Sequence, residues 1–261
     1  MFSKEPRCHY ALAPLAEVIC QLRFPEILTI QANAPATFQD AIRDQYPVYL
    51  RRQELPMPTV ANLSGNLTLQ KKEPVINHQF ATPDGVWRVN LTSKFISLTC
   101  SKDTCWEEFA AHLDKPLAAF IQVYKPAYFE RVGLRYLNFI SRTLLGLEDV
   151  PFSQLIAPCD LGLLAEADVA EPTVSRSTVD CEMPIQGGCR IKLHAGPGKT
   201  KRGNREDPEI KFIFDQDLYM TGPLQVNLVP ATLQTLHGQA FSIFRGAVTD
   251  TLHTAMEPEI L

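Results

Sequence analysis

Two arginines flank a glycine within a long apolar stretch of this sequence, from Tyr128 to Arg142. The β-branched and aromatic residues of the stretch predict a strand, in which Arg131, Gly133 and Arg135 share one face. A guanidinium among apolar side chains requires a carboxylate or phosphate partner, and a glycine leaves room for one. Together with Asn138 on the opposite face, these residues are our candidate site for a small anionic ligand.

Carboxylates elsewhere in the chain offer a structural alternative to a bound anion. Four of them occur in predicted strands: Asp180, Glu182, Asp215 and Asp217. Any of these can pair with the arginines and fix the register of the sheet, and we favour this ion-pair network over the anion site. Asp215 and Asp217 also lie on the same side of one strand, where two carboxylates can bind a divalent cation. That arrangement keeps open a metal-dependent nuclease or phosphoesterase that uses them with Arg135.

The segment from Gly196 to Pro208 is rich in glycine, lysine, arginine and asparagine, which predicts an exposed loop. Its start, Gly-Pro-Gly-Lys-Thr, resembles the end of a phosphate-binding loop, but Leu193 occupies the position of the first glycine and no helix is predicted to follow. We therefore interpret the segment as a hairpin tip. Its basic residues could contact nucleic acid: Lys199, Lys201, Arg202 and Arg205. The net charge of −4 argues against nucleic acid as the main partner.

Other catalytic signatures are missing from the sequence. The six histidines have no zinc-ligand spacing, no Gly-x-Ser-x-Gly elbow occurs, and no order of cysteine and histidine resembles a known protease. We therefore expect no cofactor and favour a protein that is not an enzyme.

Length and composition favour an ordinary globular protein, because the 261 residues are 45% hydrophobic and 21% charged. The first residues lack the apolar core of a signal peptide, and no apolar run approaches the roughly 18 residues of a membrane span. We therefore expect a cytoplasmic protein without membrane contact. Its seven cysteines, an odd number without Cys-x-x-Cys spacing, fit reduced thiols better than disulfides.

Strand and helix signals follow one another through the first half of the chain. The predicted elements are a strand over 14–24, a short helix over 35–45, a loop over 49–74 that contains an edge strand over 63–69, and strands over 75–81, 85–92 and 94–100. A long helix then begins, with Asp103 or Thr104 as its cap, and continues to Tyr124. Pro116 in its middle predicts a kink, or two helices that meet there.

The second half has a similar order. After the strand over 128–142, the predicted elements are a helical turn over 152–156, an ambiguous segment over 161–170, strands over 174–183, 189–195 and 209–219, and a final helix from 230 to 252. We therefore predict an α+β protein of two fused sheet-and-helix halves, 1–126 and 127–261, packed as one globular unit. This internal duplication would form a curved sheet of the TATA-box-binding-like or helix-grip-like type.

Several short motifs together carry a family resemblance. The motifs are Arg-Val-Gly-Leu-Arg-Tyr-Leu-Asn at 131–138, Trp106 and Phe109 on the preceding helix, Pro-Leu-x-Glu-Val at 14–18 and Phe-Asp-Gln-Asp-Leu-Tyr at 214–219. They resemble a sporadically distributed bacterial family of conserved hypothetical proteins, over nearly the whole chain. The resemblance implies no established reaction or ligand. The patchy distribution of the family implies carriage on mobile or defence-associated DNA.

These observations favour a non-enzymatic binding or interaction protein. We expect it to act on a partner protein or a small anionic ligand, and to be able to form a homodimer. The alternatives are the metal-dependent nuclease or phosphoesterase that uses Asp215 and Asp217, and a nucleic-acid-binding protein that uses the basic segment 196–205.

Overall fold

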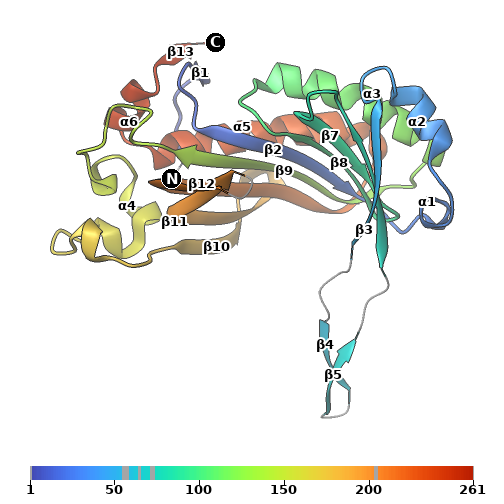
Figure 1. The fold of residues 1–261 in the computed structure, drawn as a ribbon, viewed down its shortest axis with the longest axis horizontal. Coiled ribbons are helices and arrows are strands. Elements are labelled where there is room, and N and C mark those ends of the chain that lie inside the picture. The colour runs from blue at the N-terminus through green and yellow to red at the C-terminus, as the bar shows by residue number, and fades with distance from the viewer. Residues whose placement is uncertain (1, 55–58, 64–65, 71–73, 203–204, 261) are drawn as a thin grey trace.

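The computed structural model describes residues 2–54, 59–63, 66–70, 74–202 and 205–260. Its main feature is one sheet of nine strands, each antiparallel to its neighbours, with two long helices against one face (Figure 1). From edge to edge the strands are β10 (Val179–Pro184), β11 (Arg190–Arg202), β12 (Arg205–Leu224), β9 (Phe129–Ile140), β2 (Leu15–Arg23), β8 (Phe95–Cys100), β7 (Trp87–Leu91), β6 (Val75–Ala81) and β3 (Val48–Glu54). The predicted α+β class is therefore confirmed.

The helices and the remaining strands complete the fold. The helices are α1 (Leu28–Ala32), α2 (Ala36–Ile42), α3 (Trp106–Tyr124), α4 (Pro158–Leu161), α5 (Val229–Ala247) and α6 (Asp250–Ala255). Two further strand pairs stand apart from the large sheet: β1 (Cys8–Tyr10) with β13 (Pro258–Ile260), and β4 (Thr59–Leu63) with β5 (Asn66–Gln70). Within the described ranges, no helix combines the length and the apolar character needed to cross a membrane.

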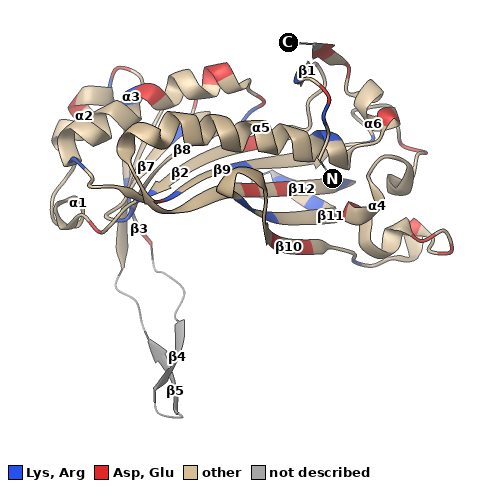
Figure 2. Cartoon of the chain, turned by 180° about the vertical axis from the view of Figure 1, so that it is seen from behind, with Lys and Arg blue, Asp and Glu red and all other residues tan. Residues whose placement is uncertain are grey.

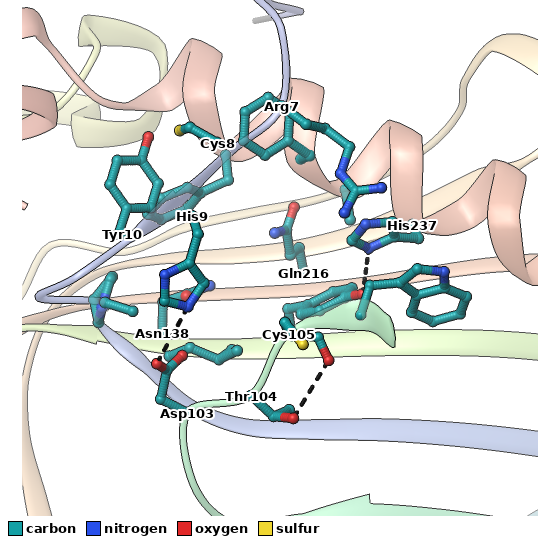
Figure 3. A pocket seen from close by; sticks show the side chains of 18 residues that line it. Arg7, Cys8, His9, Tyr10, Asp103, Thr104, Cys105, Asn138, Gln216 and His237 are labelled. Carbon is teal, nitrogen blue, oxygen red and sulfur yellow. Dashed lines mark hydrogen bonds and ion pairs between the residues drawn. The ribbon is translucent and has the colours of Figure 1, made fainter. Parts of the chain in front are cut away.

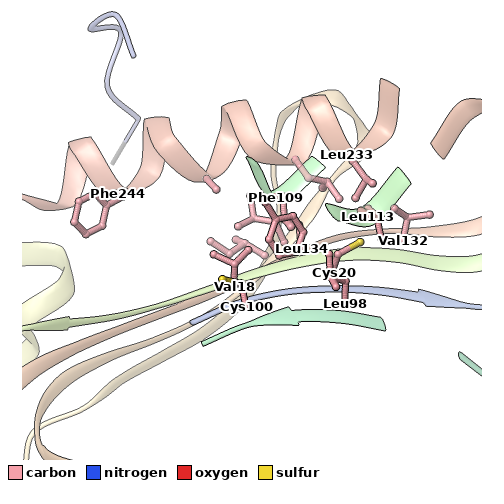
Figure 4. Packing of buried hydrophobic residues seen from close by; sticks show 14 of the residues in the cluster. Val18, Cys20, Leu98, Cys100, Phe109, Leu113, Val132, Leu134, Leu233 and Phe244 are labelled. Carbon is pink, nitrogen blue, oxygen red and sulfur yellow. The ribbon is translucent and has the colours of Figure 1, made fainter. Parts of the chain in front are cut away.

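The core lies between the sheet and the two long helices (Figure 4). In β2, Val18, Cys20 and Leu22 alternate toward this core, as their spacing predicts. Val132 and Leu134 of β9 extend the same face, and the apolar residues of α3 and α5 cover it. Full burial of one such side chain contributes about 1.5–3 kcal/mol, so this layer supplies most of the stabilisation.

The pairing of β2 with β9 joins the two ranges of the chain into one sheet. On one side of this pair, β8, β7, β6 and β3 all come from residues 48–100, and on the other side β12, β11 and β10 come from residues 179–224. Gln21 of β2 lies opposite Gly133 of β9, and Ile19 lies opposite Arg135. The strand predicted over 128–142 is therefore central in the sheet.

Two segments predicted as loops contain strands. β3 lies at the start of the predicted loop 49–74 and pairs with β6 along its whole length. In the segment 196–208, β11 and β12 pair as far as Arg202 and Arg205. Composition did not predict these strands, because hydrogen bonds between backbone groups hold them in the sheet whatever their side chains are. An edge strand or the end of a hairpin can also carry polar side chains that face water. The edge strand predicted over 63–69 includes positions 64 and 65, which lie outside the described residues.

Helix boundaries also differ from the prediction. The N-cap of α3 is Cys105 rather than Asp103 or Thr104, and its thiol accepts a hydrogen bond from the backbone N–H of Glu108 at 3.4 Å. Pro116 lies within one continuous helix, so the alternative of two helices is wrong. The final predicted helix is divided into α5 and α6, because Val248 is extended and forms a bridge with Ile156.

Candidate functional site

The two arginines of β9 are paired with the two aspartates of β12. Arg131 donates from Nη2 to both carboxylate oxygens of Asp217, at 2.7 and 2.8 Å. Arg135 donates from Nε to Oδ1 of Asp215 at 2.7 Å, and from Nη2 to the other oxygen. This hydrogen-bonded carboxylate raises the pKa of Arg135 above its ordinary value. The ion-pair network expected as the alternative to a bound anion is therefore present.

The other two candidate carboxylates pair within the same half of the sheet. Asp180 lies 2.7 Å from Nδ1 of His194, and Glu182 lies 3.4 Å from Nζ of Lys192. Figure 2 shows acidic and basic residues alternating across β10, β11 and β12. The charges on this face thus compensate one another between neighbouring strands.

The space beside Gly133 is occupied by the side chain of Arg131. A Cβ built on Gly133 would come within 2.8 Å of Cζ of Arg131 and overlap its Nη1. The same guanidinium lies over the ring of Tyr219, with Cζ 4.5 Å from the ring centroid. The glycine thus admits an arginine of its own strand, so this position offers little room for a ligand.

The geometry gives little support to a cation at Asp215 and Asp217. Both carboxylates already accept from arginines, and the described part of the chain contains no group of three or more histidine, cysteine or acidic side chains that could hold a metal ion. A hard cation binds through oxygen ligands, and the two arginines already occupy the carboxylate oxygens that would provide them here.

The predicted basic patch is described only in part. Lys199 pairs with Glu206 at 3.0 Å, and Lys201 is exposed. The side chains of Arg202 and Arg205 lie outside the part that the structure describes. The Gly-Pro-Gly-Lys-Thr sequence lies in β11, so it forms strand rather than a phosphate-binding loop.

Asn138 lies on the opposite face of β9, where it lines a pocket of about 130 Å³ (Figure 3). This pocket, called here the N-terminal pocket, is lined by residues 7–10 and 13–15, the start of α3, α5, and strands β9 and β12. Asn138 is buried and donates from Nδ2 to the carbonyl of Phe214 at 3.3 Å. The sheet therefore separates Asn138 from Arg131 and Arg135. The predicted ligand site of these three residues and Gly133 does not form.

His237 of α5 is held in the pocket by two aromatic neighbours. Its ring stacks on that of Trp106 with centroids 4.7 Å apart and planes 9° apart, and its Nδ1 lies 2.7 Å from the hydroxyl of Tyr136. Burial, with a smaller contribution from the nearby charge of Arg7, lowers the pKa of His237 to about 4. Burial raises the pKa of Tyr136, so both side chains are neutral near pH 7.

Two residues that line this pocket each have a buried polar atom without a partner in the described structure. Nε2 of His237 and Oε1 of Gln216 are both buried, and neither forms a hydrogen bond with any described residue. Gln216 is only 2% exposed, and in Figure 3 its side chain points into the pocket. A buried polar atom that no protein group, water or ligand satisfies costs about 1–3 kcal/mol, so a partner for these atoms would stabilise the protein.

The N-terminal segment covers the pocket and is fixed at several points. Ser3 and Ser242 exchange two hydrogen bonds, Glu5 forms two with the guanidinium of Arg245, and Arg7 donates to Glu107 at 3.1 Å. Arg245 is only 7% exposed and also donates to Asp250 at 2.9 Å. These contacts hold a segment without helical structure across α5.

Sequence reasoning missed most residues of the N-terminal pocket. One signal was available, because Tyr136, Asn138 and Gln216 are polar residues on the apolar side of alternating strands. Arg7 and His237 carried no such signal. These two residues come together only because the N-terminal segment crosses α5, and no local sequence pattern predicts that crossing.

Comparisons with known proteins add no name to this site. No family model matches the chain, and no curated protein matches it either. The function is therefore argued from the geometry of the site.

Proposed function

We propose that this protein binds a small ligand in the N-terminal pocket and is not an enzyme. The observation that supports this proposal is that two residues lining one pocket, Gln216 and His237, each have a buried atom without a partner in the described structure, Oε1 and Nε2 respectively. A ligand that hydrogen-bonds to both would remove the cost of their desolvation. Pockets of this type, mostly apolar with a few polar groups that converge, are the common form of small-molecule sites.

The chemistry of the pocket favours recognition over proton transfer. An effective general acid or base has a pKa near the working pH, whereas that of His237 is lowered to about 4 and that of Tyr136 is raised. Neither group is therefore poised to exchange a proton near pH 7. On the opposite face of the sheet, Arg131 and Arg135 are already paired with carboxylates, which makes that face the weaker candidate for an anion.

We also infer an internal duplication from the order of the strands. From the central pair outward, the first half contributes β2, β8, β7 and β6, and the second half contributes β9, β12, β11 and β10. In each half the strand nearest the centre comes first in sequence among these four strands, and a long helix, α3 or α5, follows the last of them. This order supports the TATA-box-binding-like or helix-grip-like interpretation, and the resemblance to the sporadically distributed bacterial family is likewise kept as a proposal.

A fragment screen tests the ligand-binding proposal. The chain has two tryptophans, and the indole N–H of Trp106 donates to Gln234 beside the pocket. A fragment bound in the pocket is expected to shift the amide-type NMR signal of the Trp106 indole and to leave that of Trp87 unchanged. If no fragment in a library of several chemical classes shifts the Trp106 signal selectively, the proposal is wrong.

The variant Gln216→Met supplies a second test. Methionine is similar in size but has no carbonyl to desolvate, so the protein without ligand is expected to be more stable by about 1 kcal/mol. Fragments that donate a hydrogen bond to the carbonyl of Gln216 are expected to bind this variant more weakly. A gain in stability together with a loss of binding is typical of a residue retained for function. Gln53→Met, at an exposed position of strand β3 and away from the pocket, is the matched control.

A further inference from the structure

We infer that the ligand is a small apolar carboxylic acid, bound as its carboxylate between Arg7 and His237, and that it carries a hydrogen-bond donor for Gln216. This inference rests on the proposed function and specifies the class of ligand for the same pocket. Three features support it: whether each unpartnered atom of the pocket residues donates or accepts a hydrogen bond, the positive charge of Arg7, and the volume between the apolar walls.

His237 presents an N–H group to the pocket. The Tyr136 hydroxyl, kept protonated by burial, forms one hydrogen bond in the described structure, and its partner is Nδ1 of His237. We assign the hydroxyl as the donor and Nδ1 as the acceptor, because the reverse assignment would leave the hydroxyl hydrogen without an acceptor in the described structure. A neutral imidazole has one hydrogen on its two nitrogens, so this hydrogen is on Nε2. The unpartnered atom is thus a donor, and it requires an acceptor.

Arg7 places a positive charge next to this donor. In Figure 3 its guanidinium points toward the ring of His237, and the repulsion between the two contributes to the low pKa of the histidine. One nitrogen of Arg7 donates to Glu107, which leaves further N–H groups of the fork for a ligand. A guanidinium and an N–H group that converge fit a carboxylate, whose two oxygens can accept from both.

The acidic side of the pocket does not oppose this arrangement. Asp103 is the acidic residue that lines the pocket, and it pairs with His9 at 3.8 Å. Figure 3 places this pair across the pocket from Arg7 and His237, with Gln216 between them. The negative and positive groups are thus at opposite ends, which orients a carboxylate toward Arg7.

The walls limit the remainder of the ligand. Leu15, Trp106, Phe241 and Phe244 contribute apolar surface, and the volume of about 130 Å³ is close to that of a cavity of about 150 Å³ that binds benzene. An aromatic ring or a branched chain of similar size fits this space. The carbonyl oxygen of Gln216 then accepts from a hydroxyl or amino group on that ring.

Binding of four probes tests the inference: benzoate, 3-hydroxybenzoate, 4-hydroxybenzoate and the neutral amide benzamide. Affinities measured by calorimetry, with the Trp106 indole signal to confirm the site, are expected to be at least about tenfold higher for benzoate than for benzamide. One hydroxybenzoate is expected to bind more tightly than benzoate. The variant Gln216→Met should abolish this difference and leave the affinity for benzoate unchanged.

Variants of the two donors complete the test. Arg7→Gln and His237→Phe are each expected to weaken the binding of benzoate by about tenfold or more and to leave the weak binding of benzamide unchanged. The phenyl ring of His237→Phe can keep the stack on Trp106. Because this variant leaves the Tyr136 hydroxyl without its partner, the double variant with Tyr136→Phe is measured as well. Lys4→Gln removes the same charge from an exposed position and is the control for net charge.

The possible results separate the inference from the proposed function. If benzamide binds as tightly as benzoate, or if both donor variants retain full affinity for benzoate, the inferred ligand class is wrong. If none of the acids binds while another fragment shifts the Trp106 signal, the ligand class is wrong and the pocket still binds a ligand. If no compound shifts that signal, both proposals are wrong.

Discussion

Substitution of Gly133 by alanine is expected to destabilise the protein through a side chain two residues away. The three atoms nearest to the added Cβ all belong to the guanidinium of Arg131. This guanidinium must therefore move, and it would leave the carboxylate of Asp217 and the ring of Tyr219. The perturbation tests whether the glycine is present to admit the arginine.

The magnitude follows from the contacts that are lost. The side chains of Arg131 and Asp217 are 16% and 28% exposed, so water reaches their charge-assisted hydrogen bonds only in part. These bonds contribute about 1.5–3 kcal/mol to the free energy of unfolding. The contact with Tyr219 adds about 0.5–1 kcal/mol. Against this, alanine in a strand is favoured over glycine by about 0.5–1 kcal/mol. Since the displaced arginine regains some hydration, we expect a net loss of about 1–2 kcal/mol.

A double-mutant cycle gives the decisive measurement. In an Arg131→Ala background the obstructing guanidinium is absent, so Gly133→Ala is expected to stabilise the protein by about 0.5–1 kcal/mol. The free energy of unfolding is measured by urea titration of all four proteins, after refolding has been shown to be complete. The reasoning is refuted if Gly133→Ala has the same sign and size of effect in both backgrounds.

The remaining predictions concern the pocket and its surroundings. The pKa of His237 is about 4 in the folded protein, below its ordinary value of 6.5. The folded state therefore binds fewer protons between these values, and the free energy of unfolding is expected to fall from pH 6.5 toward pH 4. His237→Phe should reduce this slope in urea titrations. Arg245→Met should lower the free energy of unfolding by about 1–3 kcal/mol and accelerate tryptic cleavage after Arg7. Cys105→Ser should raise stability by about 0.5 kcal/mol, since a hydroxyl caps a helix better than a thiol.

Each of these predictions has a control. Other histidines also have lowered pKa values, so the pH dependence is judged from the difference between wild type and His237→Phe. Asp250 is 93% exposed, so Asp250→Asn should have little effect on the cleavage that Arg245→Met accelerates. Cys105→Ala should be less stable than wild type, and an equal or greater stability would contradict the capping role of Cys105.

The sequence predicted those parts of the fold that have strong periodicity. Val18, Cys20 and Leu22 alternate toward the core as expected. The charged residues of an otherwise apolar strand correctly indicated ion pairs with carboxylates of other strands, and of the four candidates the partners are Asp215 and Asp217. β3 was missed because all seven of its residues are exposed, which removes the alternation that marks a strand. The break at Val248 was missed because apolar spacing continues through it, and only the bridge to Ile156 ends the helix.

The pocket shows a different limit. Its walls come from segments that are distant in sequence, and an unpartnered polar atom is a property of the packed structure rather than of any residue type. Asn138 was selected from the sequence, but together with Arg131 and Arg135, which lie across the sheet from it. Alternation correctly assigned these residues to opposite faces; it could not indicate which face contains a pocket.

The pairing of β2 with β9 has a consequence for synthesis of the chain. Gln21 of β2 pairs with Gly133 of β9, which is 112 positions later in the chain. This side of β2 therefore stays unpaired until β9 has been synthesised. At about 5–20 residues per second, the interval lasts on the order of 10 s. During this time the strands that precede β9 can form only a partial sheet with a bare edge at β2. An unpaired strand edge can pair with a strand of another chain, so the nascent protein exposes a site for association until β9 is made.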